Sequence, residues 1–387
     1  GCTDVSVLAG NAVTGPKLLI LVTEDWYFHS HRLALARTAV TSGFEVVVAT
    51  RIGELRPAIE AAGIRVIDYP FDRRGMNPLR AILDVLRLAR LIRSERPDIV
   101  HNVALKPVVL GGLACRLSGC RNVVNAIAGM GFLFTERSRA PLVSAIVRIL
   151  LAMVGSRGVT IVQNPDDGRL LAKAGVPASR IRHLPGVGVD LQAFQQSPEP
   201  SGVPVAALPA RLLWDKGVAE FVEAARILKS RGVAVRCVLV GMPDKGNPTS
   251  VGTEQVAAWV KEGVVEWWGH STDMPATFSR TSIVCLPSYR EGFPKVLAEA
   301  AACGRPIVTT DVPGCREVVT DGDNGMLVPP RSAGQLAMAI EALAADRALR
   351  HQFGLAGRRR AEREFSSESA NASMLRIYGE MLTGLQA

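Results

Sequence analysis

Two glutamates eight positions apart, Glu291 and Glu299, are the residues whose types and spacing most clearly suggest chemistry. Glu291 stands in the loop sequence YREGF, directly after the apolar run IVCLPS, and Glu299 falls about two turns into a helix predicted to start near Pro294. Carboxylates accept hydrogen bonds from sugar hydroxyls, and Glu299 suits the paired hydroxyls of a ribose. A simple strand-to-helix turn requires neither residue. The alanines beside Glu299 favour a buried face over a solvated one.

The start of this helix predicts a binding site for phosphate oxygens or sugar hydroxyls. The first backbone N–H groups of a helix have no partner within the helix, and its dipole favours an anion. Gly292 allows a ligand to approach the backbone closely. The residues that we assign to donor binding here are Gly292, Phe293, Pro294, Lys295 and Val296.

A pair of cations marks a second candidate site in the sequence LPARLLWDKG, residues 208–217. Arg211 and Lys216 flank a short loop that leads from a predicted strand into a helix opening at Gly217. Two cations beside a helix N-terminus suit a diphosphate. An isolated Arg/Lys pair is by default a pair of solvated surface residues. The position at the carboxyl end of a strand favours a functional interpretation.

The elements that position these residues alternate between strand and helix along both halves of the chain. This pattern predicts an α/β fold with two doubly wound parallel sheets, whose ligands bind at the carboxyl ends of the strands. The stretch SPEPSGVP, residues 197–204, is typical of a linker. We therefore expect a loose leader (1–16), a first domain (17–196), a second domain (203–365) and a C-terminal helix that crosses back to the first domain (366–387).

The charge and the cysteines narrow the class of protein. Residues 1–200 hold 24 Lys/Arg and 16 Asp/Glu, against 21 and 20 in residues 201–387, so the net charge of +9 belongs almost entirely to the first half. A basic first half could bind a phosphorylated substrate or an anionic membrane. It lacks the alternation of aromatic and basic residues that is typical of proteins that bind nucleic acid. Seven cysteines without a CxxC pattern indicate reduced thiols of a cytosolic protein. Neither a secretory signal nor a spanning apolar run is expected.

Four stretches together resemble a known enzyme family. LPARLLWDKG, PGVGVD, PSYREGFPKVLAEAAACGRPIV and VPGCREVVTDGDNGMLVPP are similar to the retaining family 4, or group 1, glycosyltransferases, which have the two-lobed GT-B fold. The paired glutamates with seven residues between them are that family's signature. The first half, with TEDWYFHSHRLALARTA and NAIAGMGFLF, resembles a bacterial subgroup that builds capsule, O-antigen and protein-glycan precursors on polyprenyl diphosphate.

The resemblance implies a role for each matching donor-side residue. Arg211 and Lys216 would hold the donor diphosphate, and Glu291 would orient the transferred sugar. Glu299 would bind the ribose, while backbone groups near Gly269 and His270 would take the base. The donor would be a nucleotide sugar, with UDP favoured, and the enzyme would need no metal and no cofactor. The sequence Asp321-Gly322-Asp323 imitates a metal-binding DxD, but its residue types also suit a turn, and we reject the metal interpretation.

The acceptor side carries a departure from the family. Many relatives have a histidine after the strand that matches VVNAIAG, and here residues 125–131 have none. The acceptor-side candidates are His31, Lys106, Asn125 and Gly129. No nucleophile is proposed: the resemblance implies front-face attack, in which the leaving diphosphate takes the acceptor's proton.

Two other functions fit the same sequence: a UDP-sugar 2-epimerase on the same fold, and a non-enzymatic two-lobed sugar-binding protein. A NAD enzyme is disfavoured because GxGxxG is missing after the first strand. The family likeness implies a lipid-linked acceptor and therefore a cytoplasmic enzyme at the inner face of the membrane. The arginine-rich helix in residues 72–96 and the apolar helix in residues 140–155 suit a surface of anionic lipid. Core packing is the favoured interpretation of residues 140–155 alone. Together with the lipid-linked acceptor that the resemblance implies, the two helices predict a peripheral enzyme on an anionic membrane.

Overall fold

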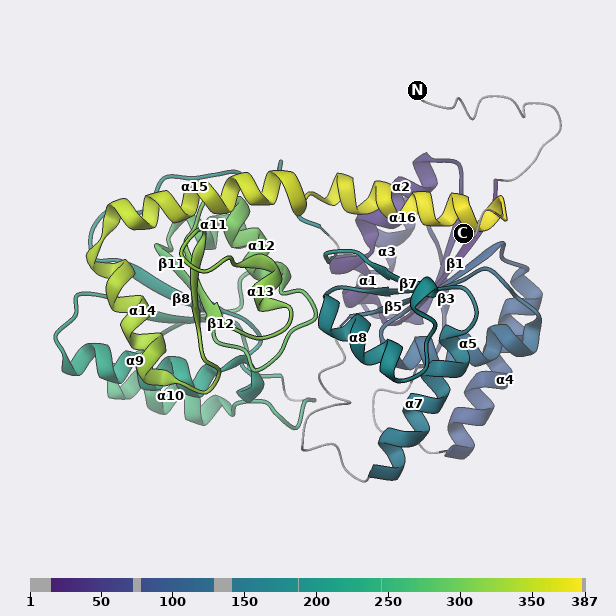
Figure 1. The fold of residues 1–387 in the computed structure, drawn as a ribbon, viewed down its shortest axis with the longest axis horizontal. Coiled ribbons are helices and arrows are strands. Elements are labelled where there is room, and N and C mark those ends of the chain that lie inside the picture. The colour runs from purple at the N-terminus through teal and green to yellow at the C-terminus, as the bar shows by residue number, and fades with distance from the viewer. Residues whose placement is uncertain (1–14, 72–77, 129–140, 187, 245, 385–387) are drawn as a thin grey trace.

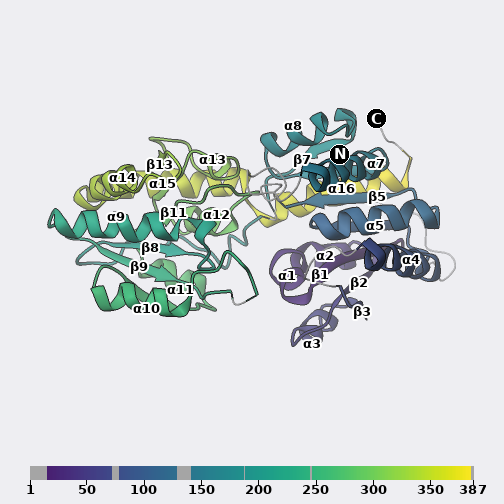
Figure 2. The same ribbon diagram turned by 90° about the horizontal axis from the view of Figure 1, so that it is seen from below.

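The chain forms two lobes, each built on a parallel sheet with helices on both faces (Figures 1 and 2). This computed structural model describes residues 15–71, 78–128, 141–186, 188–244 and 246–384. The α/β class with two doubly wound sheets, predicted from the alternating pattern, is confirmed. Because all strands of a parallel sheet end on the same edge, each lobe gathers the loops that follow its strands along one side.

The first sheet has the strand order β3-β2-β1-β4-β5-β6-β7 in the described part of the chain. Its central strands are buried and mostly apolar, as expected for parallel strands covered on both faces, with His101, Asn102 and Asn125 as buried polar residues. The strands are β1 (Lys17–Glu24), β2 (Glu45–Arg51), β3 (Arg65–Asp68), β4 (Ile99–Val103), β5 (Val123–Ile127), β6 (Val159–Val162) and β7 (Ile181–His183).

Helices bury both faces of the first sheet. One core cluster joins the sheet to α1, α2, α3 and the last helix of the chain, and two others join it to α4, α5, α7 and α8. The helices are α1 (Asp25–His31), α2 (Leu33–Thr41), α3 (Arg56–Glu60), α4 (Pro78–Glu95), α5 (Leu105–Ser118), α7 (Pro141–Gly155) and α8 (Pro165–Lys173).

The second sheet has the order β10-β9-β8-β11-β12-β13, and all its pairs are parallel. The strands are β8 (Val205–Pro209), β9 (Arg236–Val240), β10 (Glu266–Gly269), β11 (Ile283–Leu286), β12 (Ile307–Thr310) and β13 (Gly325–Val328). The helices are α9 (Val218–Ser230), α10 (Thr253–Glu262), α11 (Met274–Ser279), α12 (Lys295–Ala302), α13 (Cys315–Val318), α14 (Ala333–Ala345) and α15 (Arg347–Glu364).

The chain passes between the lobes twice, and the two crossings are hydrogen-bonded to each other. Val189 N donates to the carbonyl of Phe365 at 2.7 Å, and Ser367 N donates to the carbonyl of Val189 at 2.9 Å. After the second crossing, α16 (Ser367–Leu382) packs on α2 and β4 of the first lobe (Figure 1). Its Tyr378 is fully buried and its hydroxyl lies 2.6 Å from His101 Nδ1.

Candidate active site

Lys216 and Glu291 meet at the carboxyl edge of the second sheet. Lys216 Nζ lies 2.5 Å from Glu291 Oε1, and the hydroxyl of Ser288 donates to the same oxygen at 2.6 Å. Both side chains are largely buried, with exposed fractions of 19% and 12%. Since both contacts go to Oε1, the carboxylate is held in one orientation while Oε2 is available to a hydroxyl of a ligand.

Two glycines allow the loops of this site to approach closely. Gly217, which precedes α9, has φ +73°, and a Cβ there would lie 2.1 Å from the carbonyl oxygen of Pro287. Gly314, with φ +84°, lies under Glu291, whose own Cβ would be 2.8 Å from a Cβ at position 314. Glycine alone tolerates both the positive φ and the contact. The sequence Val312-Pro313-Gly314 therefore supports the position of Glu291, and we did not predict this role from the sequence.

The N-terminus of α12 faces the same edge and has no side-chain cap. Pro294 is the N-cap residue, and α12 begins at Lys295, one residue after the predicted start. Phe293 and Val296 pack into the adjoining core, so their backbone and not their side chains would meet a ligand. The free N–H groups of the first turn, together with Lys295, make this helix end suitable for an anion.

Glu299 is buried one turn further along α12. Burial raises its pKa, and Lys295, at 3.4 Å from Glu299 Oε1, opposes that rise. A desolvated carboxylate held by a single cation gains most from a ligand that donates hydrogen bonds to it. The structure thus places Glu299 where the sequence analysis predicted it, on the buried side of the helix.

The other donor-side candidates lie around the same edge but are more exposed. Arg211 follows β8, is 52% exposed and pairs with Asp244 at 3.0 Å. Gly269 ends β10 with φ +73°, its carbonyl accepts from Gly241 N at 2.7 Å, and the exposed His270 follows it. The assignment of Gly269 and His270 to the nucleotide base stays a prediction.

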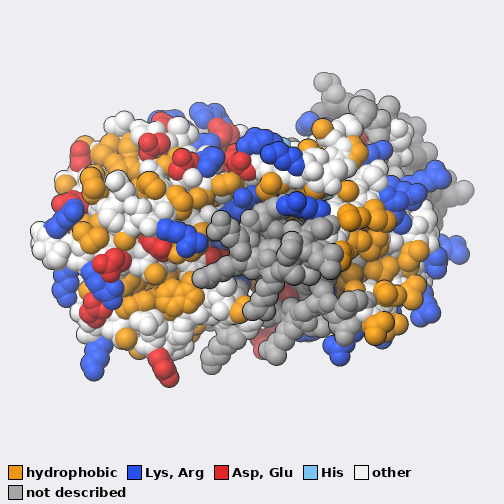
Figure 3. All heavy atoms as spheres, turned by 60° about the horizontal axis from the view of Figure 1, so that its bottom comes forward, with side chains coloured by type: hydrophobic (Ala, Val, Ile, Leu, Met, Phe, Trp, Pro, Cys, Tyr) orange, Lys and Arg blue, Asp and Glu red, His pale blue; other side chains and the backbone are white. Residues whose placement is uncertain are grey.

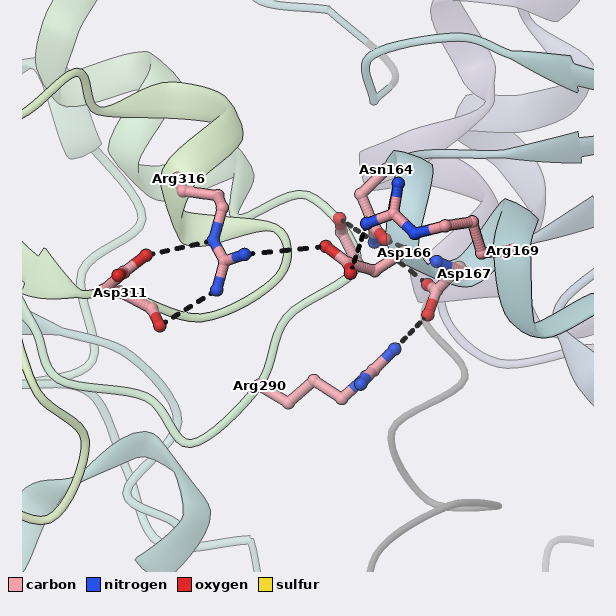
Figure 4. A network of polar contacts seen from close by, with 8 residues as sticks. Asn164, Asp166, Asp167, Arg169, Arg290, Asp311 and Arg316 are labelled. Carbon is pink, nitrogen blue, oxygen red and sulfur yellow. Dashed lines mark hydrogen bonds and ion pairs between the residues drawn. The ribbon is translucent and has the colours of Figure 1, made fainter.

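The loop that carries Glu291 is docked on the first lobe, as Figure 4 shows. Asn164, the N-cap of α8, donates from Nδ2 to the carbonyl of Gly292 at 2.9 Å. Arg290 forms an ion pair with the fully buried Asp167. Sequence reasoning missed both contacts, because Asn164 and Asp167 look like ordinary residues of a helix start.

Two further contacts close the space between the lobes. Lys295 Nζ donates to the carbonyl of Ser30 at 3.0 Å. The ring of Phe293 lies against Gly186, where a Cβ would come within 2.3 Å of a ring carbon. The carboxyl edges of the two sheets therefore face each other across a narrow interface that includes Glu291 and the start of α12.

The four acceptor-side candidates have different fates. His31 lies at this interface and stacks on Tyr27, with ring centroids 4.3 Å apart. Lys106 lies partly buried in the first turn of α5. Asn125 is fully buried in β5, where its Oδ1 accepts from Asn102 Nδ2 at 2.9 Å, and its contact with an acceptor stays a prediction. Gly129 lies outside the described residues.

His31 should make the protein sensitive to acid. Burial, with smaller contributions from Lys295 and Arg32, lowers its pKa to about 4 from the usual 6.5. Between these values the unfolded chain binds a proton that the folded protein excludes, so stability falls as the pH drops through this window. We expect His31→Gln to remove up to about 3 kcal/mol of this pH dependence.

Calorimetric unfolding at pH 7 and at pH 4.5 measures this effect. The exposed His351→Gln should unfold like the unmodified protein at both values. An unchanged difference between the two pH values in His31→Gln would contradict the assignment.

Comparison with known proteins identifies the family. Residues 190–360 match the family model described as glycosyl transferases group 1, and residues 17–163 match a glycosyl transferase 4-like model. A D-inositol 3-phosphate glycosyltransferase from Xylanimonas cellulosilytica is 30% identical over 90% of both chains. The chain belongs to the group 1 glycosyltransferases.

Other relatives and solved structures agree with this assignment. An N,N'-diacetylbacillosaminyl-diphospho-undecaprenol α-1,3-N-acetylgalactosaminyltransferase from Campylobacter jejuni is 27% identical over 79% of this chain and 83% of its own. The structure of HepE from Anabaena with UDP and glucose superposes with a TM-score of 0.78 at 19% identity, over 94% and 99% of the two chains. This likeness confirms the GT-B fold of this glycosyltransferase.

The acidic sequence at residues 321–323 forms a turn in this glycosyltransferase. Asp321 Oδ1 accepts from Leu327 N at 2.9 Å, and Gly322 has φ +76°. Among the described residues, no group of three or more His, Cys, Asp or Glu side chains could hold a metal ion. The turn contacts agree with the rejection of a DxD motif here; whether the reaction needs a metal stays open to the test below.

Proposed function

We propose that this glycosyltransferase transfers a sugar, with retention of configuration, from a UDP-sugar to a polyprenyl-diphosphate-linked saccharide. The observation that carries the donor half is the Lys216–Glu291 pair beside the uncapped start of α12. Cations and free N–H groups there suit the diphosphate, and the carboxylate suits the sugar. The names of the relatives, which include transferases acting on diphospho-undecaprenol acceptors, support the acceptor half.

In the proposed reaction, the bond between the anomeric carbon and the diphosphate oxygen breaks while a bond to an acceptor hydroxyl oxygen forms on the same face. The acceptor's proton passes to the departing diphosphate oxygen. Lys216 stabilises the negative charge that develops on the diphosphate, which is the kind of contribution that a preorganised cation makes in a dry site. Glu291 and the docked loop position the sugar for the attack.

Product analysis tests this function directly. The protein is incubated with radiolabelled UDP-N-acetylhexosamine or UDP-hexose and with a short-chain prenyl diphosphate saccharide, with and without excess EDTA. We expect an α-linked product in the lipid phase at equal rates in both conditions. Release of a C2-epimerised sugar without transfer would favour the epimerase alternative, and loss of activity in EDTA would restore a metal to the mechanism.

An exposed apolar surface on the first lobe supports a membrane-associated acceptor. On α4, Leu79 is 73% exposed, and on α7, Ile149 is 61% exposed. The other members of this patch are Ile82, Leu83, Leu86, Ile146 and Met153. Figure 3 shows apolar side chains gathered over this lobe with Lys and Arg around them. Core packing accounts for the buried faces of α4 and α7 but not for these exposed apolar side chains.

We infer that this α4/α7 patch lies on the membrane surface. Exposed arginines on the same helices, such as Arg87 and Arg90, suit anionic lipid, whereas Arg73 and Arg74 lie outside the described residues. No helix in the described parts of the chain is long and apolar enough to cross a bilayer. The attachment that we propose is peripheral, through the exposed side chains of α4 and α7.

Vesicle sedimentation in low salt should detect this attachment. Changing Ile82, Leu83 and Ile149 to serine should reduce binding to vesicles that contain anionic lipid at least tenfold, because each apolar side chain leaves water on binding. Added salt should release the unmodified protein. The matched control is Val260→Ser, an exposed apolar residue of the second lobe. Equal binding to neutral and anionic vesicles by the unmodified protein would contradict the proposal.

A further inference from the structure

Arg32 is a buried arginine without a partner among the residues that the structure describes. It joins α1 to α2 in the first lobe and is 5% exposed. In the described part of the chain, no side chain or carbonyl forms a hydrogen bond or ion pair with its guanidinium, and its Nε is enclosed without an acceptor. Arginine stays charged in proteins, and a buried charge without a counter-ion is costly. The fold therefore retains a cation that its own packing does not use.

Arg32 lines a narrow hollow of the first lobe, between the sheet and α16 and next to the interface with the second lobe. The polar residues around it are His31, Gln163 and Asn371, and no carboxylate is among the described residues that line it. The low pKa of His31 keeps that ring neutral at pH 7, so Arg32 is the fixed charge of the hollow. The hollow has room for a small oxyanion but not for a sugar ring.

The position of the hollow connects it to the candidate active site. Gly186 lines it and also touches Phe293 of the Glu291 loop. Ser30, two residues before Arg32, accepts from Lys295 at the start of α12. An anion beside Arg32 would therefore lie on the first-lobe wall, opposite the second-lobe residues Lys216 and Arg211 that we assign to the donor diphosphate.

We propose that Arg32 binds a phosphate group of the acceptor in this hollow. The planar guanidinium matches phosphate oxygens geometrically, and the amides of Gln163 and Asn371 supply further donors around the same space. The assignment to the acceptor rests on the proposed function, since the donor's phosphates already have partners on the other lobe. Arg32 is thus a positioning residue: it fixes the acceptor so that its hydroxyl reaches the sugar.

The first test uses inorganic phosphate and the full chain saturated with UDP, which occupies the donor's own anion site. We expect phosphate, added at constant ionic strength against chloride, to raise the thermal unfolding midpoint of the unmodified protein. Arg32→Gln should lose this rise, and Arg32→Lys should keep part of it. Arg37→Gln, which changes an exposed arginine of α2, should behave like the unmodified protein.

The phosphate-free midpoints separate a binding role from a structural one. Without phosphate, Arg32→Gln should unfold at the same temperature as the unmodified protein or higher, because it removes a buried charge without a partner. A lower midpoint together with an intact phosphate effect would overturn the proposal. If Arg32→Gln does not fold, equal phosphate effects in Arg32→Lys and the unmodified protein, or no effect in either, would overturn it as well.

The source of the phosphate is decided by two further comparisons. If UDP abolishes the phosphate effect, Arg32 belongs to the donor site and the acceptor assignment fails. In transfer assays, Arg32→Gln should raise KM at least tenfold for a prenyl diphosphate saccharide but not for the same saccharide as an alkyl glycoside. Phosphate binding through Arg32 without any transfer to prenyl diphosphate would leave the anion site standing and overturn only the proposed acceptor.

Discussion

Glu291→Gln should lower the turnover number of the transferase about a hundredfold to a thousandfold, while its affinity for UDP stays equal or increases. Glutamine keeps the shape of the side chain but removes the charge that holds Lys216 and faces the sugar. Lys216, released from its 2.5 Å contact, is then free to meet the diphosphate. Steady-state kinetics give the turnover number, and calorimetry with UDP gives the affinity.

The exposed Glu254→Gln, on α10, is the matched control and should change neither quantity. Two results would contradict the role of Glu291 at the sugar. One is an unchanged turnover number; the other is a loss of UDP affinity as large as the loss of turnover.

Lys216→Met should weaken UDP binding by roughly 1.5–3 kcal/mol, the usual loss for one hydrogen bond to a charged group. The same change at Arg211 should cost less, because Arg211 is 52% exposed and already paired with Asp244. Lys216 is 19% exposed, so its charge is screened less by water. Titration calorimetry with UDP measures both variants, and equal affinities in all three proteins would refute the diphosphate assignment.

A double-mutant cycle adds a sharper result. Since Lys216 and Glu291 contact each other, the combined variant should lose less transition-state stabilisation than the sum of the two single variants. Strict additivity would mean that the contact does not persist when substrates are bound.

Much of this architecture was readable because parallel α/β folds repeat simple rules. The apolar runs predicted the strands. Because the carboxyl ends of parallel strands lie on one side of the sheet, the same pattern predicted that Lys216 and Glu291 lie close together although 75 positions separate them. The burial of Asn125 could not be predicted, because a polar residue near a strand end looks accessible, and only the structure shows α5 above its partner Asn102.

Other features depend on tertiary partners that no local pattern contains. Arg32 reads as a surface cation at a helix start, yet it is buried. Asp167 and Arg290, 123 positions apart, form an ion pair across the lobes that neither sequence segment predicts. Spacing predicts which residues share an edge of a sheet, whereas the burial and pairing of single charges depend on what packs against them.

The paired crossings at Val189 and Phe365–Ser367 limit how this enzyme can move. Two connecting segments that are hydrogen-bonded to each other resist twisting and separation better than a single segment. We therefore expect the lobes to open by a hinge rotation about this double connection. Because α16 follows the second crossing and places Tyr378 in the core of the first lobe, this helix anchors the connection to that lobe. Protease cleavage near residue 366 should therefore remove the double connection between the lobes and destabilise the first lobe.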